Sequence, residues 1–282
     1  MKIIKTPQAM QKIADSIHRQ GKTIGFVPTM GYLHQGHLDL VKIARRKSDI
    51  VVVSIFVNPT QFGPKEDLNK YPRDFNRDEK LLAKEKVDYI FYPTVKSMYP
   101  KNYATSIDLP SLTNVLCGKS RPAHFQGVAT IVAKLFNIVK PDLAVFGQKD
   151  GQQAVIIKQM VQDLNFPIKI IVAPTTREKD GLAMSSRNIY LTPEQREQAV
   201  VLYHALQHAK KMIKDGEKNI HKIIALMEEL IESIPDAKID YIQIVDADTL
   251  QPIQQISGKI LIALAVKFGH CRLIDNMIVK IR

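Results

Sequence analysis

The chain has 282 residues, 45% hydrophobic and 24% charged, which is typical of a globular protein with a well-buried core in one or two domains. No apolar run approaches the roughly 20 residues of a membrane-spanning helix, and the N-terminal MKIIKTPQAM lacks the apolar stretch and cleavage site of a signal peptide. The formal charge of +12 comes mostly from lysines spread over amphipathic helical patterns, so we expect neither a nucleic-acid partner nor a membrane partner.

Strand and helix patterns alternate along the first part of the chain. Helical patterns cover residues 6–21, 37–47, 76–86, 127–140 and 152–164; the first has Thr6 as its cap and Gly21 as its stop. Buried strand patterns cover residues 23–27, 49–57, 89–92, 143–146 and 168–173. This order predicts an α/β fold, a Rossmann-like open parallel sheet with helices on both faces.

The pattern changes after Pro174. Two helical stretches, residues 192–216 and 220–233, precede strand patterns at 239–246, 259–266 and 271–281. We therefore predict a Rossmann-like domain over residues 1–174 and a smaller α+β domain over 175–282. The two cysteines, Cys117 and Cys271, have no metal or redox spacing, which is typical of a protein of the reducing cytoplasm.

Polar loops follow four of the predicted strands. They are residues 28–37 (PTMGYLHQGH), 56–62 (FVNPTQF), 146–153 (FGQKDGQQ) and 174–188, which contains TREKDGLAMSSRN. Because ligands of open α/β sheets bind outside the carboxyl ends of the strands, we predict a site where these loops converge. No G-x-G-x-x-G follows the first strand, and CGKS at 117–120 lacks the first glycine of a P-loop, so neither phosphate motif is present.

His34 and His37 have three possible roles. They could bond to backbone at a helix start, or ligate a metal, although no carboxylate or cysteine accompanies them. We favour phosphate binding, because a helix N-terminus offers free N–H groups and a positive dipole end. Gly31 and Gly36 would then let the backbone approach a nucleotide closely.

The other motifs also have structural alternatives. Lys149 and Asp150 could form a surface ion pair, Gln152 and Gln153 an exposed helix start, and residues 185–187 a cap or turn. Their coincidence at four strand ends favours a binding site over these separate explanations.

Several motifs resemble one known family in order and spacing. FVPTMGYLHQGH, SIFVNPTQF, RPAHFQGVATIVAKLFNIVKPDLAVFGQKDGQQ, DGLAMSSRNIYL and RLIDN are similar to the pantoate–β-alanine ligases, over residues 22–276. HxGH alone would indicate only the wider nucleotidyltransferase superfamily, in which MSSR looks like the counterpart of a KMSKS loop. Another adenylyl-transferring enzyme of that superfamily and a basic nucleic-acid-binding protein are the alternatives.

The resemblance implies a reaction and its partners. (R)-Pantoate and ATP give pantoyl adenylate and pyrophosphate, and β-alanine then displaces AMP to give pantothenate. Mg²⁺ accompanies the nucleotide, with unknown protein ligands, and the family suggests a homodimer.

The resemblance also implies site residues. His37 takes the proton-donor position, Gln61 and Gln153 bind pantoate, and Gln61 also meets β-alanine. The ATP-binding residues would be Met30, Gly31, Tyr32, Leu33, His34, Gln35, Gly36, His37, Gly147, Gln148, Lys149, Asp150, Thr176, Met184, Ser185, Ser186 and Arg187. Thr176 stands where the family has valine, a change that a backbone contact would tolerate. Residues 63–74 resemble a mobile loop over the site, and Arg121 and His124 lie in a motif without an assigned role.

Overall fold

A six-stranded parallel sheet forms the first part of the chain. The computed structural model describes residues 1–64 and 66–281. The strands are β1 (Lys2–Ile4), β2 (Ile24–Thr29), β3 (Ile50–Ile55), β4 (Tyr89–Phe91), β5 (Leu143–Gly147) and β6 (Lys169–Ala173), in the spatial order β1-β4-β3-β2-β5-β6. All pairs are parallel, which confirms the predicted fold class. The sequence analysis missed β1, because three residues at a sheet edge are too few to form a recognisable pattern.

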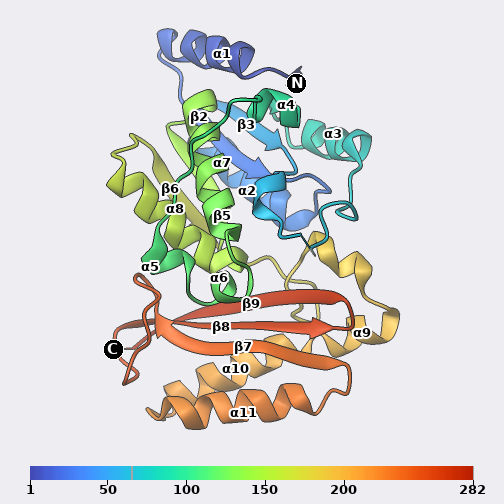
Figure 1. Cartoon of the computed structure of the whole chain (residues 1–282), viewed down its shortest axis with the longest axis vertical. Coiled ribbons are helices and arrows are strands. Elements are labelled where there is room, and N and C mark those ends of the chain that lie inside the picture. The colour runs from blue at the N-terminus through green and yellow to red at the C-terminus, as the bar shows by residue number, and fades with distance from the viewer. Residues whose placement is uncertain (65, 282) are drawn as a thin grey trace.

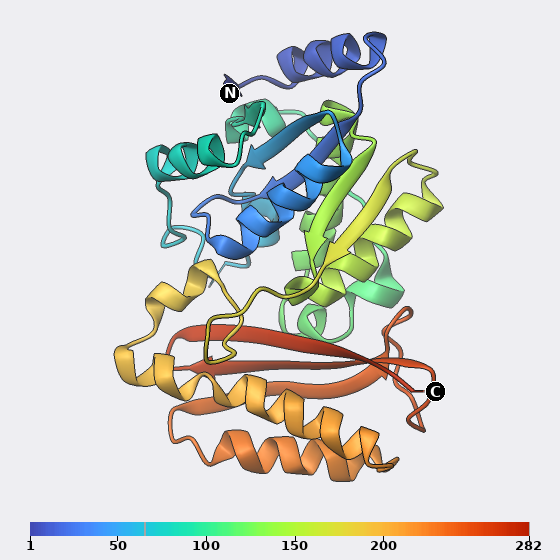
Figure 2. The ribbon, with the colours of Figure 1, turned by 180° about the vertical axis from the view of Figure 1, so that it is seen from behind.

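Helices cover both faces of this sheet. Phe26 and Val52 belong to a core with α1 (Pro7–Arg19), α7 (His124–Val139) and α8 (Gly151–Asp163). Their neighbours Val27 and Val53 belong to a second core with α2 (Gln35–Lys47) and α3 (Phe75–Lys84), on the face that Figure 2 turns to the viewer. The alternation of neighbouring residues between two cores explains why the strand patterns are continuously apolar. Shorter elements are η1 (Pro59–Gln61), α4 (Val95–Met98), α5 (Pro110–Thr113), α6 (Cys117–Ser120), η2 (Gln148–Asp150) and η3 (Ser186–Tyr190).

A three-stranded antiparallel sheet follows (Figure 1). Its strands, β7 (Ala237–Asp246), β8 (Lys259–Phe268) and β9 (Cys271–Lys280), pack on one face against α10 (Val201–Lys214) and α11 (Ile220–Glu232). On the other face, Val245, Leu261 and Ala263 join the core of the first part. The second sheet is therefore buried from both sides.

The predicted helix over residues 192–216 is two helices, α9 (Pro193–Gln198) and α10. Ala199 and Val200 keep right-handed helical angles, but the Leu202 amide bonds back to the Ala199 carbonyl, three residues earlier. This tighter turn interrupts the α-helical bonding without a proline or glycine, so the sequence carries no breaker signal there.

We keep the division at residues 174 and 175 as a proposal. One core lies entirely within residues 182–279 and another within 27–173, as separate domains would give, whereas the third core joins residues of both parts. Among the described residues, no helix is long and apolar enough to cross a membrane.

The strand order places a crevice at the carboxyl ends of β2 and β5. β2 pairs with β3 on one side and with β5 on the other, and Gly25 is in register with Leu143. The chain leaves β2 through α2 toward β3, away from β5, so a crevice opens at the carboxyl ends of β2 and β5. The start of α2 and the turn η2 flank it.

Candidate active site

The first wall of the site is the N-terminus of α2. His34 is the N-cap, and its Nδ1 accepts the backbone N–H of Gly36 at 3.2 Å. His37 Nδ1 accepts the backbone N–H of His34 at 3.3 Å, and the two ring centroids lie 4.1 Å apart. Both histidines therefore cap the helix through Nδ1, which is the structural role that the sequence left open.

Within residues 1–64 and 66–281, no hydrogen bond uses the other ring nitrogen, Nε2, of either histidine. Burial, helped by nearby Lys149, lowers the pKa of His34 to about 4. Burial, then His34 and Lys149, hold the pKa of His37 well below its usual value, so both rings are neutral at pH 7. Because each Nδ1 accepts a hydrogen bond, each neutral ring carries its proton on Nε2. Two uncharged N–H donors thus stand beside a lysine at a helix start.

The loop before α2 is held by Asp78 of α3. This buried carboxylate accepts the backbone N–H groups of Tyr32 and Leu33, both at 2.7 Å. Gly31 has φ +87°, and an added Cβ would lie 2.9 Å from Ile55 and 3.1 Å from Asp78. The conformation of the loop therefore requires a glycine at position 31 whether or not a nucleotide is bound.

A second wall of the cavity carries two arginines, each paired with a carboxylate. Arg187 pairs with Asp67, with Nε–Oδ2 at 2.9 Å and Nη2–Oδ1 at 3.0 Å. Arg121 pairs with Glu66 in the same bidentate way, at 2.8 and 2.5 Å. Glu66 and Asp67 belong to the 63–74 segment, so this part of the segment lies against the site.

His124 supports this second wall. Its Nδ1 donates to the Gln61 carbonyl at 2.7 Å, so its Nε2 accepts from Arg121 at 3.0 Å. Burial and the Arg121 charge lower the pKa of His124 to about 4, which keeps the ring neutral. Arg121, His124 and Glu66 thus form one connected network.

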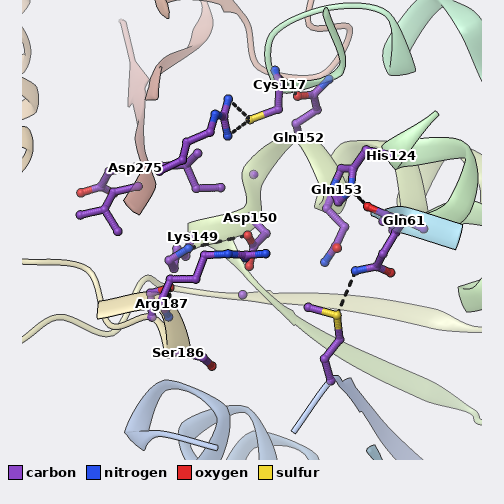
Figure 3. Close-up of a pocket in the computed structure, with 18 of the residues that line it drawn as sticks. Gln61, Cys117, His124, Lys149, Asp150, Gln152, Gln153, Ser186, Arg187 and Asp275 are labelled. Atoms are coloured by element: carbon purple, nitrogen blue, oxygen red, sulfur yellow. Dashed lines mark hydrogen bonds and ion pairs between the residues drawn. The ribbon is translucent and has the colours of Figure 1, made fainter. Parts of the chain in front are cut away.

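Amide side chains also line the cavity. Asn58 donates to Gln61 Oε1 at 3.1 Å, so the Gln61 amide nitrogen is left as the donor, and it lies 3.0 Å from the Met30 sulfur. Figure 3 shows Gln61 and Gln153 on one side of the pocket and Lys149, Asp150, Ser186 and Arg187 on the other. Gln152 is different, because it is buried and bonds to the backbone of Leu112, Val115 and Cys117.

The walls enclose a cavity of about 1000 Å³. This volume is at the upper end for small-molecule sites and suits a nucleotide with a second substrate. The predicted residues that line it are Met30, His34, Gly36, His37, Gln61, Gly147, Lys149, Asp150, Gln153, Thr176, Met184, Ser185, Ser186 and Arg187.

Comparison with known proteins decides the family. The family model described as pantoate-beta-alanine ligase matches residues 2–278. The chain belongs to the pantoate–beta-alanine ligase family. It is therefore an enzyme that joins pantoate and β-alanine with ATP, which decides between the ligase and the two alternatives left open by the sequence.

Relatives match this family member over their full length. The pantothenate synthetase of Caldicellulosiruptor bescii is 55% identical over 280 residues, covering 99% of each chain. That of Fervidobacterium nodosum is 56% identical over 280 residues, covering 99% of this chain and all of the relative.

Solved structures of the family have the same fold. Pantothenate synthetase from Thermus thermophilus superposes with a TM-score of 0.93 at 45% identity, covering 98% and 99% of the two chains. Pantoate–beta-alanine ligase from Francisella tularensis, described as complexed with beta-gamma ATP and beta-alanine, gives 0.81 at 38% identity, covering 98% and 97%.

Five of the predicted residues of this ligase do not line the cavity: Gly31, Tyr32, Leu33, Gln35 and Gln148. Leu33 is fully buried in the core, Gln35 bonds to Asp39, and Gln148 bonds to Asn276. They shape the loops that carry the lining residues.

Sequence reasoning also missed several residues at the site. Asp67 and Tyr71 line the cavity from the 63–74 segment, and Asn58 and Asn276 line it too. Asn58 and Asn276 also hold neighbouring residues in place, and Asp78 holds the loop before α2. Asn58 and Asn276 lie inside the quoted motifs, but only their contacts identify what they do. No local pattern points to Asp78, because its partners are 45 and 46 residues away.

Proposed function

We propose that the ligation proceeds within this cavity in two steps. A carboxylate oxygen of pantoate attacks the α-phosphorus of ATP, the bond to the bridging oxygen breaks, and pyrophosphate leaves with that electron pair. The β-alanine amine then attacks the acyl carbon of pantoyl adenylate. The carbon–oxygen bond to AMP breaks, the amine loses a proton, and pantothenate and AMP remain.

The observation that carries this proposal is the neutral histidine pair at the start of α2. Its Nε2–H donors, the helix dipole and Lys149 converge on the crevice between β2 and β5. Fixed donors of this kind stabilise charge that develops on departing pyrophosphate. A bound phosphate would also raise the histidine pKa values, so His37 becomes able to supply a proton as pyrophosphate leaves.

We assign ATP to both walls and pantoate to the amides of the cavity. Met30 to His37 and Gly147 to Asp150 form one side of the ATP site, and Thr176 with Met184 to Arg187 forms the other. Gln61 and Gln153 bind pantoate, and Gln61 also meets β-alanine. Because Asn58 donates to Gln61 Oε1 and one Gln61 N–H donates to the Met30 sulfur, the second amide N–H is the group that suits a carboxylate or hydroxyl oxygen.

Magnesium fits as an ion carried by the nucleotide. Within residues 1–64 and 66–281, no group of three or more His, Cys, Asp or Glu side chains could hold a metal ion. Mg²⁺ usually takes one or two carboxylates together with substrate phosphates and water. Asp150, which lines the cavity and exposes 49% of its side chain, is the carboxylate we propose for this role.

Two wider predictions also remain proposals. We expect a homodimer, on the family resemblance, which light scattering would measure. We expect the enzyme in the cytoplasm, consistent with free cysteines that are both buried.

A burst experiment tests the two-step reaction. Pantoate, MgATP and enzyme without β-alanine should release pyrophosphate once per active site, and β-alanine should then allow AMP release and further turnover. Pyrophosphate that appears only when β-alanine is present would contradict a separate adenylation step.

A further inference from the structure

We infer that Asn276 is a positioning residue for Lys149, acting from the second sheet through the backbone of η2. Asn276 Nδ2 donates to the carbonyl oxygens of Gln148 at 2.9 Å and Lys149 at 2.8 Å. Its Oδ1 accepts from Gln148 Nε2 at 2.8 Å. One side chain from β9 therefore holds the turn that follows β5 by three hydrogen bonds.

The turn has little local support of its own. No side chain caps η2, and none caps the N-terminus of α8 that follows it. Asn276 is buried, with 7% of its surface exposed, and both its donors and its acceptor are used on this turn. The carbonyl groups of residues 148 and 149 would otherwise need water or another donor.

Gly151 permits the close approach of the two sheets. A Cβ at this position would lie 3.0 Å from Asn276 Oδ1 and 2.9 Å from Gln148 Nε2. The glycine is thus explained by the Asn276 contact, and it requires no special backbone angle, since its φ is −56°. Strand β9 lies along the side of the second sheet that faces the first (Figure 1).

The preceding residue makes a second link of the same kind. Asp275 pairs with Arg177 through two contacts, at 2.5 and 2.9 Å, and is itself buried. Arg177 follows Thr176 in the segment that runs on to Met184 and Arg187. Two consecutive residues of β9 therefore attach to both proposed ATP segments, which fixes η2 relative to the MSSR loop.

Asn276 would thereby set the position of the Lys149 ammonium group. Burial is the main cause of the lowered pKa of His34 and His37, and the ammonium group of Lys149 is close enough to lower both pKa values further. A misplacement of about 1 Å at a reacting centre can cost on the order of 100-fold in rate. The inference rests on the proposed role of Lys149 in ATP binding.

Asn276→Asp is the sharpest test, because it keeps the shape but places a carboxylate oxygen against two carbonyl oxygens. We expect single-turnover pyrophosphate release to fall roughly 10- to 100-fold. The KM for ATP should rise, and that for pantoate should stay within about twofold. Asn102→Asp, the same chemical change at an exposed residue, controls for the added charge.

A double-mutant cycle with Lys149→Ala then separates positioning from general damage. If Asn276 acts through Lys149, Asn276→Asp should cost less than about threefold in the Lys149→Ala background. The inference would be overturned if the losses in rate caused by the two substitutions were fully additive, or if Asn276→Asp kept the parent rate. The proposed ATP role of Lys149 would stand in either case. A parent rate in Lys149→Ala would overturn the ATP role of Lys149 and the inference with it. If Asn276→Asp fails to fold, Asn276→Ser, with one donor and no added charge, takes its place in the cycle.

Discussion

The two walls of the cavity present positive character to an anion in different ways. At the start of α2, His34 and His37 are neutral, and no hydrogen bond within the described residues uses either Nε2. On the second wall, Arg121 and Arg187 carry full charges, but each already holds a carboxylate of the 63–74 segment.

The first wall thus offers donors without a partner, whereas the second offers charges that are already paired. The two histidines can bind a phosphate without breaking an existing hydrogen bond. The free energy of the new hydrogen bonds is therefore not reduced by the loss of others. If Arg187 binds ATP as we propose, it exchanges Asp67 for a phosphate, and only the difference in free energy between the two ion pairs contributes to binding. The exchange also ties the position of the 63–74 segment to the ligand, because the released carboxylate belongs to that segment.

The largest expected effect is on the histidine wall. His37→Asn keeps a side-chain acceptor for the His34 amide but loses the Nε2–H donor and the titrating ring. We expect a melting temperature near that of the parent and a fall of roughly 100-fold or more in adenylation. Single-turnover pyrophosphate release measures this rate. A folded variant that adenylates pantoate at the parent rate would reduce His37 to a helix cap.

The arginine wall gives the next largest effect. Arg187→Gln should slow adenylation about 10- to 100-fold, the scale of hydrogen bonds to a charged group. Asp67→Asn breaks the same ion pair but leaves the guanidinium free, so its KM for ATP should stay the same or fall. If Arg187→Gln and Asp67→Asn slow adenylation equally, the role of Arg187 is only to hold the 63–74 segment.

Gln152 and Gln153 test whether the acid binds at the amides of the cavity. Gln153→Ala should raise the KM for pantoate by about 10-fold, since one buried hydrogen-bonding partner is worth roughly 1–3 kcal/mol, with little change for ATP. Its neighbour Gln152→Ala removes three bonds to backbone and should mainly lower the melting temperature. A matched loss of ATP affinity in Gln153→Ala would place this residue in the nucleotide site instead.

The last effect concerns the pH dependence of stability. His34 and His124 have pKa values of about 4 in the fold and 6.5 in the unfolded chain, so the unfolded state binds more protons between these values. Their contribution is complete above about pH 6.5 and is lost as the pH falls toward 4, by at most about 2 kcal/mol each at pH 5.

Glu66 provides the contrast in this experiment. Although burial opposes it, Arg121 holds the pKa of Glu66 below its usual 4.5, so this carboxylate loses its stabilising effect only below about pH 4.5. The free energy of unfolding, measured with urea, should therefore be lower at pH 5 than at pH 7. His34→Asn and His124→Gln should each make this difference smaller. If the difference in free energy of unfolding between pH 7 and pH 5 is the same in both variants as in the parent, groups other than these histidines titrate in this range.

Local patterns predicted most of the elements. The strand at residues 49–57 and the helix after Thr6 follow from apolar periodicity and capping, which act within a few residues. The parallel sheet followed from their alternation, and the convergence of loops followed from the parallel sheet. The patterns gave no warning of the edge strand β1 or of the interruption between α9 and α10.

Within the site, the sequence could place residues on loops but could not say what each one contacts. His34 and His37 were found because their spacing and the helix start are adjacent in sequence. The pairing of Arg187 with Asp67 joins residues 120 positions apart, and that of Asn276 with Gln148 joins residues 128 apart. The sequence by itself thus determined the family, the parallel sheet and the helix start at which we propose that phosphate binds. Only the tertiary structure decided which donors are free and which are already paired, because burial and long-range contacts set both.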